Sequence, residues 1–324
     1  MPLRRSYRGR FAPTPSGDLH LGGARTALLA WLDARKVGGQ LLVRVEDLDA
    51  PRTIVGAEAR ILDDLRWLGL DWDEGPDLGG TYEPYRQSER MARFAEVLSQ
   101  LVHEGKAYPC FCSRREIAMA ATAPHGPSDD GPRYLGTCRT LTRKQLVERA
   151  RIRPPSIRLR VEPGSVEWTD RLFGDRSDDV ASAVGDFVLR RGDNVPAYQL
   201  AVVVDDADMR ISDVVRADDL LSSTARQILL YEALGLQPPR HAHVPLVNGP
   251  DGVRLSKRHG AIGIRALRER GVESRELVGA LAATLGLVEP GTRITAPELL
   301  PHFDLDKLPR GATRLDVDTL RSLG

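Results

Sequence analysis

The feature of this sequence that most constrains its fold is a strand, loop, helix and strand pattern near the N-terminus. A short mixed segment at 6–12 leads into a proline-rich loop at 13–17, and a crowded apolar run predicts a buried helix over 22–32. A second apolar run at 40–45 predicts a strand that ends at Glu46. This spacing is typical of a βαβ unit with parallel strands. Because such sheets bind ligands beyond the carboxyl ends of their strands, we expect a site where the 13–17 loop and Glu46 meet.

The rest of the chain predicts a second half of the sheet, separated from the first by an insertion. Amphipathic helices are expected at 54–68 and 85–104, strands at 156–160 and 186–190, and a helix at 220–234 closed by Gly235. The segment 107–138 holds the cysteines and a stretch rich in Pro, Gly and Asp, which marks it as inserted between core elements.

We therefore expect an α/β fold: a doubly wound parallel sheet with an inserted subdomain and a short helical C-terminal region. The expected divisions are 1–104 for the first half of the sheet domain, 105–185 for the insertion, 186–262 for the second half and 263–324 for the C-terminal region.

The composition describes an ordinary folded protein whose charges are separated along the chain. Its 46 basic and 45 acidic residues give a formal net charge of +1, and a hydrophobic content of 41% excludes a disordered or fibrous chain. No apolar run approaches the roughly 20 residues of a membrane span, and the basic N-terminus has no apolar region behind it, so we expect a cytoplasmic protein without a membrane partner. Residues 139–160 hold eight basic residues and one acidic residue, whereas 205–219 hold six Asp and two Arg. Such a basic stretch either binds a phosphate backbone or is a solvated helix face.

The three cysteines, Cys110, Cys112 and Cys138, are an odd number in a pattern that excludes a disulfide framework. Their thiolates form a soft donor set that suits tetrahedral Zn²⁺. The fourth ligand is open on chemistry alone, which favours His125 among the candidates within the same loop, namely His125, Asp129, Asp130 and Tyr134. The alternative is three buried thiols without a metal.

Two loops carry residues suited to nucleotide chemistry. In the first, prolines fix a loop, His20 follows, and Gly22 and Gly23 open a helix whose N-terminus can face an anion. In the second, at 254–260, a turn-rich loop presents Lys257, whose ammonium group can offset charge on a transferring phosphoryl group. Taken singly, the first loop is equally a helix start with an incidental histidine, and the second a surface hairpin.

Together, the two loops resemble the HIGH and KMSKS signatures of class I aminoacyl-tRNA synthetases. The HIGH-like motif consists of Pro13, Thr14, Pro15, Ser16, Gly17, Asp18, Leu19, His20, Leu21, Gly22 and Gly23, and the KMSKS-like motif of Arg254, Leu255, Ser256, Lys257 and Arg258. The residues at 44–52, 198–206 and 214–220 are similar to the glutamyl branch of that family, and the resemblance extends over roughly residues 8–262 in the family's order. It implies a Rossmann-like (HUP-type) catalytic domain with a zinc-binding, acceptor-type insertion.

The resemblance also implies a ligase that uses ATP to activate L-glutamate as glutamyl-adenylate. The implied glutamate site consists of Arg10, Phe11, Ala12, Pro13, Thr14, Glu46, Tyr198 and Arg216, and the implied ATP site of His20, Gly22, Gly23 and Lys257. The guanidinium groups of Arg10 and Arg216 can make bidentate pairs with the substrate's carboxylates, and Glu46 can pair with its ammonium group. His20 and Lys257 are the expected catalytic residues. Mg²⁺ would accompany ATP, although no carboxylate cluster marks a dedicated site for it.

The cysteine spacing and the chain length resemble a stand-alone paralogue within the glutamyl branch. Cys-x-Cys followed by Tyr-x₃-Cys is similar to the zinc site of that paralogue, which implies Tyr134 as the fourth ligand of one structural Zn²⁺, with His125 as the alternative. Only residues 261–324 follow the KMSKS-like loop, too few for the helical anticodon-binding region expected of a glutamyl-tRNA synthetase. The paralogue's family transfers glutamate to the queuosine at the wobble position of tRNA(Asp), so we expect a monomer whose partners are L-glutamate, ATP and that tRNA.

The basic stretch at 139–160 is then the candidate RNA contact, through Arg143, Lys144, Arg149 and Arg151. Three other functions stay open at this point. The chain could be a truncated or split glutamyl-tRNA synthetase that charges tRNA(Glu), a non-catalytic protein that binds glutamate or RNA, or an enzyme that activates glutamate for an acceptor other than tRNA.

Overall fold

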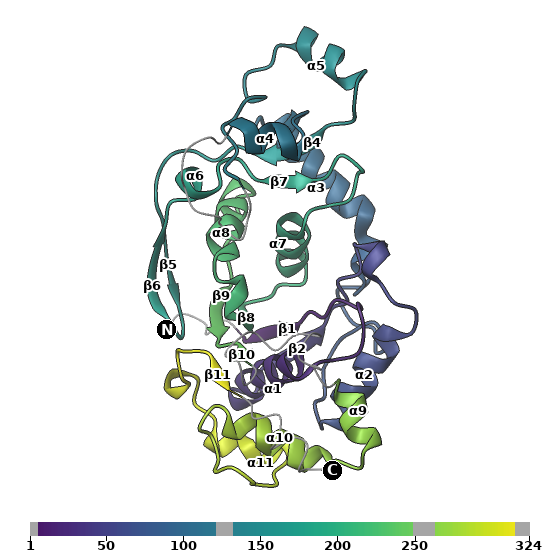
Figure 1. Cartoon of the computed structure of the whole chain (residues 1–324), viewed down its shortest axis with the longest axis vertical. Helices are drawn as coiled ribbons and strands as arrows, with labels where there is room; N and C mark the ends of the chain where they lie inside the picture. Colours follow the sequence, from purple (N-terminus) through teal and green to yellow (C-terminus); the bar gives the residue numbers. More distant parts are fainter. Residues whose placement is uncertain (1–5, 121–131, 249–262, 315–324) are drawn as a thin grey trace.

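Two parallel strand pairs, each with a helical crossover, lie at the centre of the molecule (Figure 1). The structure is a computed structural model that describes residues 6–120, 132–248 and 263–314. The first pair comprises β1 (Arg8–Phe11) and β2 (Gln40–Val43) with α1 (Leu21–Lys36), and the second β8 (Asp213–Ala217) and β9 (Arg240–Val244) with α8 (Ser223–Ala233). The Ser212 backbone N–H donates to the Arg8 carbonyl oxygen at 2.9 Å, which joins β8 to β1. The predicted α/β fold with a parallel sheet is confirmed.

Helix α1 is buried on almost every side, as its crowded apolar sequence predicts. Its four leucines, Leu21, Leu28, Leu29 and Leu32, are at most 1% exposed. One side of the helix packs on β1, β2 and β8, and the other meets α10 (Ser274–Ala283) and α11 (Ala296–Leu299) of the C-terminal region. Because the helix follows β1 through a short loop, its N-terminus lies at the carboxyl end of that strand.

An antiparallel sheet forms one end of the molecule, opposite the end formed by α10 and α11 (Figure 1). It has the order β3, β4, β7, with β3 at Ala107–Cys110, β4 at Ser156–Leu159 and β7 at Val188–Arg190. Helix α4 (Arg114–Ala120) follows β3 in the chain, and α5 (Arg143–Ala150) lies beyond the sheet at this end of the molecule (Figure 1). A separate apolar cluster, formed by Tyr108, Cys110, Phe111, Tyr134 and Cys138, gives this part a small core of its own.

A hairpin of β5 (Val166–Asp170) and β6 (Gly174–Asp178) extends the parallel sheet at the edge of β9. The register pairs Asp170, the last residue of β5, with His241 of β9. Asp170 also fixes the turn that follows, because its Oδ1 accepts hydrogen bonds from the backbone N–H groups of Leu172 and Phe173 at 2.9 and 2.8 Å. The hairpin lies within residues 105–185 of the sequence, yet it belongs to the parallel sheet.

The remaining elements pack around the sheet. They are α2 (Ala57–Trp67), α3 (Met91–His103), α6 (Val180–Ala183), α7 (Tyr198–Asp208), β10 (Val247–Asn248), α9 (Ile264–Glu269) and β11 (Thr313–Arg314), with 3₁₀ helices η1 (Ala50–Arg52), η2 (Gln87–Arg90), η3 (Asp218–Leu220), η5 (Leu300–His302) and η6 (Leu305–Lys307). Strands β10 and β11 pair in parallel, so the C-terminal region is tied to the segment after β9. No helix among the residues that the structure describes is long and apolar enough to cross a membrane.

Two helices begin later than their periodicity predicts. Helix α2 begins at Ala57 because Gly56 takes a left-handed conformation, with φ of 76°. The predicted helix at 85–104 is confirmed only from Met91, where α3 begins. The side chains of Gln87 and Arg90 instead bind Asp205 of α7, at 2.8 and 2.6 Å, so tertiary ion pairing and hydrogen bonding fix the stretch before α3.

Candidate active site

A cleft of about 590 Å³ opens at the carboxyl ends of the parallel strands. Its walls come from the loop between β1 and α1, the segment after β2, the end of β8 and the segment after β9. Of the residues expected at the site, it is lined by Arg10, Phe11, Ala12, Pro13, Thr14, Ser16, Gly17, Asp18, Leu19, His20, Gly22, Gly23, Glu46, Tyr198 and Arg216. Pro15 and Leu21 of the HIGH-like motif are buried and do not line it. The parallel topology therefore brings residues from four distant parts of the sequence to one place.

One buried ion network holds the acidic and basic groups on the β1 and β2 side of the cleft. Arg44 is fully buried and donates from Nη1 to Asp206 Oδ1 at 2.6 Å and from Nη2 to Glu46 Oε1 at 3.2 Å. Arg10 Nε lies 3.4 Å from Asp206 Oδ1. Asp206 therefore binds two arginines at once, and Arg44 orients Glu46 at the edge of the cleft.

Burial and these arginines act in opposite directions on the two carboxyl groups. Burial raises the pKa of Glu46, and the nearby guanidinium groups of Arg44 and Arg10 offset only part of that rise. Burial would also raise the pKa of Asp206, but Arg44 and Arg10 outweigh it and the pKa is lowered. Asp206 is thus an ionised structural partner, whereas Glu46 lies beside the cleft with its charge less fully compensated.

Arg216 is held by four protein contacts at the end of β8. Its Nε donates to His243 Nε2 at 2.9 Å and its Nη1 to Gln227 Oε1 at 2.8 Å. Its Nη2 donates to Thr224 Oγ1 at 2.8 Å and to the Leu220 carbonyl oxygen at 3.3 Å. Within the described part of the chain these contacts use four of the five guanidinium N–H groups, which leaves one on Nη1.

Tyr198 begins α7 and lines the same cleft. Tyr198 is 36% exposed, yet the protein atoms around its phenol, together with the nearby carboxylate of Glu46, raise the pKa of Tyr198, although Arg216 acts in the opposite direction. The phenol therefore stays protonated near neutral pH and can donate a hydrogen bond.

His20 caps the N-terminus of α1. Its Nδ1 accepts a hydrogen bond from the Gly23 backbone N–H at 3.0 Å, and its side chain also lines the cleft. The cap satisfies one N–H group of the first helical turn, while the helix N-terminus stays directed at the cleft. The histidine is thus a structural cap as well as a cleft residue.

The KMSKS-like motif, Arg254, Leu255, Ser256, Lys257 and Arg258, lies outside the described residues. The chain on either side of it is placed at the cleft. Before it, Val247 lines the cleft. After it, Gly263 forms a β-bridge with His20, and the Ile264 N–H donates to the Leu19 carbonyl oxygen at 2.9 Å. The segment that contains Lys257 therefore leaves the described chain at the cleft and rejoins it next to the HIGH-like motif.

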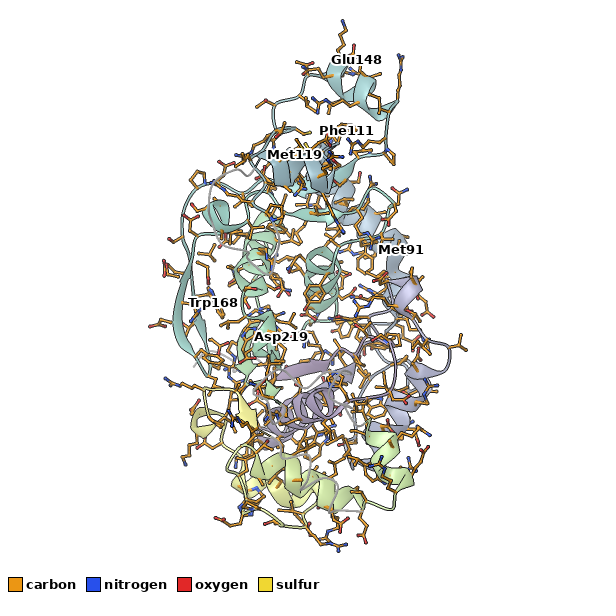
Figure 2. The ribbon with its side chains drawn as sticks, in the orientation of Figure 1. Met91, Phe111, Met119, Glu148, Trp168 and Asp219 are labelled. Carbon is orange, nitrogen blue, oxygen red and sulfur yellow. The ribbon has the colours of Figure 1, made fainter. Side chains whose placement is uncertain are left out.

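The three cysteines meet in the antiparallel part of the molecule. Their sulfur atoms all lie within 4.8 Å of one another, and Cys112 Sγ and Cys138 Sγ are 3.6 Å apart. A tetrahedral Zn²⁺ with Zn–S bonds of about 2.3 Å would place its sulfur ligands about 3.8 Å apart, so the cluster has the dimensions of a metal site. Figure 2 labels Phe111, between Cys110 and Cys112, in this part of the molecule, well away from Asp219 at the cleft.

Among the residues that the structure describes, Tyr134 places its phenol oxygen beside these sulfur atoms, where it could act as a metal ligand. Its Oη lies 3.3 Å from Cys110 Sγ and accepts a hydrogen bond from the Cys138 N–H at 2.8 Å. The Tyr134 backbone passes so close to Gly185, whose φ is 73°, that any Cβ at 185 would collide with the Tyr134 carbonyl. The alternative ligand, His125, and the acidic candidates Asp129 and Asp130 lie outside the described residues.

The basic stretch at 139–160 does not form one surface. Arg149 Nη1 lies 3.6 Å from Cys138 Sγ, and the Arg158 guanidinium stacks 4.0 Å above the Tyr134 ring, so both belong to the cysteine cluster. The assignment of Arg149 as an RNA contact stays a prediction, and its Nη1 is directed at Cys138. Helix α5, which carries Arg143 and Lys144, has no buried residue.

Sequence reasoning missed the residues that hold the site from behind. Arg44 stands two residues before Glu46, and Asp206 lies in the acidic run. Both belong to segments with family resemblance, but the sequence did not predict what either side chain contacts. His243 and Asp170 carry no local signal at all. Their roles depend on strand order, which places β5, β9 and β8 side by side.

Comparison with known proteins identifies a family whose members match almost the whole chain. Residues 6–319 match the family described as "tRNA synthetases class I (E and Q), catalytic domain". The chain is 49% identical over 316 residues to a protein of Symbiobacterium thermophilum named Glutamyl-Q tRNA(Asp) synthetase, covering 97% of this chain and 98% of that protein. It is 44% identical over 317 residues to Glutamate--tRNA ligase 2 of Syntrophus aciditrophicus, covering 97% of this chain and 64% of that protein.

A solved structure shares the fold. It is a glutamate tRNA ligase from Elizabethkingia meningosepticum in complex with its amino acid, with a TM-score of 0.85 and 28% identity, covering 98% of this chain and 69% of that one. The family match extends over almost the whole chain, and the cleft at the carboxyl ends of the strands is where a sheet of this kind binds its ligands. The chain therefore belongs to the class I aminoacyl-tRNA synthetase family, in the group specific for glutamate and glutamine, and is an enzyme of the ligase type.

Proposed function

We propose that this enzyme activates L-glutamate with ATP and transfers the glutamyl group to the queuosine at the wobble position of tRNA(Asp). The observation that carries the first half of the proposal is the charge pattern of the cleft. Two guanidinium groups, of Arg10 and Arg216, and the carboxyl group of Glu46 line it together. Glutamate carries two carboxylates and one ammonium group, so these three side chains match its charges.

In the proposed site, Arg10 and Arg216 each bind one carboxylate of the substrate, and Glu46 binds the ammonium group. Arg216 would use the Nη1 N–H that its protein contacts leave, which gives one charge-assisted hydrogen bond. A bidentate contact would require it to release the Leu220 carbonyl oxygen, its longest contact at 3.3 Å. The remaining glutamate contacts are assigned to Tyr198 and to the wall formed by Phe11, Ala12, Pro13 and Thr14.

The proposed activation step is attack by the glutamate α-carboxylate oxygen on the α-phosphorus of ATP. The new P–O bond forms glutamyl-adenylate, and pyrophosphate leaves with the electrons of the broken P–O bond. No protein nucleophile is required, so the protein contributes positioning and charge stabilisation. The α1 N-terminus with Gly22, Gly23 and His20 is suited to the phosphates, and we assign Lys257 to the leaving pyrophosphate. Mg²⁺ would accompany the ATP and neutralise part of its charge.

We further propose one structural Zn²⁺ bound by Cys110, Cys112, Cys138 and Tyr134. The phenol oxygen is supported by its distance of 3.3 Å from Cys110 Sγ, since a tetrahedral site with Zn–S of about 2.3 Å and Zn–O of about 2.0 Å separates these ligands by about 3.5 Å. The metal would tie the segment around 134–138 to β3, in a part of the molecule whose own apolar core is small.

The acceptor is supported by two observations. The 49% identical relative that matches this chain from end to end is named a Glutamyl-Q tRNA(Asp) synthetase. In addition, the exposed α5 and the residue after it carry Arg143, Lys144 and Arg151, whose charges suit an RNA phosphate backbone. The substrates would place the reaction in the cytoplasm, and we expect a monomer. Within residues 105–185, we also propose that the part outside the β5 and β6 hairpin meets the acceptor RNA, because that hairpin belongs to the parallel sheet.

Transfer of labelled glutamate to purified tRNA(Asp) with and without queuosine tests the proposal. We expect label only on the queuosine-containing tRNA, stable to digestion of its 3′ end. The 44% identity to a glutamate--tRNA ligase makes tRNA(Glu) the second acceptor to include. Label at the 3′ end of tRNA(Glu) would overturn the proposed acceptor, and glutamate-dependent pyrophosphate exchange without transfer to either tRNA would point to a different acceptor.

A further inference from the structure

Two buried side chains behind the cleft, Asp170 and His243, form a chain of hydrogen bonds that ends at Arg216 in the cleft wall. Asp170 of β5 and His243 of β9 are 1% and 0% exposed, and Arg216 of β8 is 3% exposed. His243 Nδ1 lies 2.7 Å from Asp170 Oδ2, and His243 Nε2 accepts from Arg216 Nε at 2.9 Å. Trp168, labelled in Figure 2 on the neighbouring strand, packs edge-on against the His243 ring with centroids 6.0 Å apart. The imidazole is therefore enclosed on the side of β5.

The partners of His243 decide which ring nitrogen carries the proton. Arg216 Nε–H can only donate, so His243 Nε2 must present a lone pair. The proton is then on Nδ1, where Asp170 accepts it. Burial lowers the pKa of His243 to about 4, and the Asp170 hydrogen bond offsets only part of that effect, so the ring is neutral near neutral pH. Both hydrogen bonds require this one tautomer.

Asp170 is itself fixed in the acceptor state. It receives the backbone N–H groups of Leu172 and Phe173 on Oδ1 and the backbone N–H group of His243 on Oδ2 at 3.1 Å, in addition to the His243 ring N–H. Burial would raise the pKa of Asp170, but these hydrogen bonds and that from His243 outweigh it and lower the pKa. An ionised carboxylate cannot donate, and it therefore selects the Nδ1–H tautomer in the way that a buried Asp does for a catalytic histidine.

The Nε hydrogen bond sets the plane of the Arg216 guanidinium. The contacts of Nη1 and Nη2 are made to α8 and to the segment before it, through Gln227, Thr224 and Leu220. His243 is the contact from β9 on the opposite edge of the group, and it also lies 3.2 Å from Thr224 Oγ1. We expect that loss of this hydrogen bond lets the guanidinium plane turn about the Cδ–Nε bond, which would move the Nη1 N–H that the proposed function assigns to the substrate carboxylate.

We propose that Asp170 and His243 are positioning residues for glutamate recognition: Asp170 fixes the tautomer of His243, and His243 fixes the guanidinium of Arg216 for the substrate carboxylate. This inference rests on the proposed function, because it concerns the carboxylate that Arg216 would bind. Neither residue lines the cleft, and neither is placed in contact with substrate. Both act through Arg216.

The test uses two matched substitutions of one ring. His243→Gln can place an amide oxygen near the position of Nε2 and so keep an acceptor for Arg216. In His243→Asn, the shorter side chain cannot reach Arg216 Nε, and its amide N–H keeps only the hydrogen bond to Asp170. In glutamate-dependent pyrophosphate exchange, we expect His243→Asn to raise the KM for glutamate about tenfold to a hundredfold, with the KM for ATP within about twofold of the native value. His243→Gln should restore most of the glutamate KM.

Asp170→Asn should behave like His243→Asn. The new amide N–H donates to His243 Nδ1, so the ring proton moves to Nε2. His243 Nε2–H then faces the Arg216 Nε–H and can no longer accept its hydrogen bond. The second measurement needs no variant. In ¹⁵N-detected NMR of the native protein, His243 should show its proton on Nδ1 near neutral pH. Thermal unfolding of each variant accompanies the kinetics, so a variant that fails to fold is set aside and the native tautomer decides.

Several outcomes would overturn the inference. They are a proton on His243 Nε2, equal glutamate KM values for the Asn and Gln variants, or parallel changes in the KM for glutamate and ATP. Native protein that does not exchange pyrophosphate with glutamate would overturn the proposed function and this inference with it. Native activity with an unchanged glutamate KM in all three variants would overturn this inference alone.

Discussion

Replacement of Arg44 by Met removes the guanidinium from the buried ion network but keeps a side chain of similar length. Arg44 is 0% exposed and contacts Asp206 at 2.6 Å, Glu46 at 3.2 Å and Asp205 at 3.5 Å. The substitution does not remove the same share of stabilising contacts from each of these three carboxylates. Asp205 keeps Arg90 at 2.6 Å and the Gln87 amide at 2.8 Å, so the loss falls mainly on Asp206 and Glu46.

The expected cost is large because the deleted charge leaves another charge buried without its main partner. Asp206 keeps only Arg10, at 3.4 Å, as a charged contact within the described residues. Breaking a buried pair in this way costs about 3–5 kcal/mol. The matched control is Arg191→Met, which breaks a single ion pair between Arg191 and Asp193 whose side chains are 49% and 50% exposed. That substitution should cost less than about 1 kcal/mol.

The pH dependence of the loss identifies its cause. In the native protein the pKa of Asp206 is lowered, so its contribution to stability is present above its unfolded pKa and is lost as pH falls through the folded value. In the variant only Arg10 and Arg216 would oppose the effect of burial, so we expect the pKa of Asp206 to rise. Protonation then relieves the buried charge, and the stability gap between variant and native protein should narrow as pH falls.

Urea unfolding followed by circular dichroism measures both effects, with the native protein and both variants compared at about pH 7.5 and about pH 5. A loss below about 1 kcal/mol for Arg44→Met would refute the assigned role of the network. So would a gap that stays constant between the two pH values, since it would mean that no unpaired carboxylate accounts for the loss. The exposed control should show no pH-dependent gap.

Three further predictions concern the metal, the RNA and the substrate. Cys112→Ser should abolish zinc binding, measured by metal analysis of the purified protein; full stoichiometric zinc in the variant would count against the site. Arg143→Ser, Lys144→Ser and Arg151→Ser combined should weaken tRNA binding and flatten its salt dependence, with adenylate formation unchanged; unaltered binding would contradict the RNA assignment. Because the pKa of Glu46 is raised, the KM for glutamate should increase as pH falls through that value, since the protonated carboxyl no longer attracts the ammonium group. Glu46→Gln should raise that KM about tenfold or more and remove the pH dependence; a variant with the native pH profile would exclude Glu46 as the ammonium partner.

The sequence predicts the centre of the fold well because the signals there are local. An apolar run of helical length between two short apolar runs, with a proline-rich loop before the helix, has few folded solutions other than a βαβ unit. The glycine pair after His20 predicts a helix N-terminus, and α1 begins at Leu21. The position of the site follows from the same topology, because loops after parallel strands converge at one edge of the sheet.

Element boundaries and surfaces were predicted less well, for a physical reason. Apolar periodicity continues through 85–90, yet Gln87 and Arg90 bind Asp205 across the core, and that tertiary pairing decides the backbone there. The basic run at 139–160 predicts either a contact with a phosphate backbone or a solvated helix face. In the structure Arg158 is buried above the Tyr134 ring and Arg149 Nη1 lies 3.6 Å from Cys138 Sγ, because folding brings an aromatic ring and a sulfur atom within their reach.

By itself the sequence determined the α/β fold and the family, and it predicted part of the cleft lining, because short motifs and strand-loop-helix spacing encode them. Only the tertiary structure decided how those residues are held. Arg44 reaches Asp206, and Asp170 reaches Arg216 through His243, across strands far apart in the chain. Hydrogen bonds of this kind depend on strand order and register, which bring buried polar groups to within 3 Å, and no local pattern of residue types specifies that pairing.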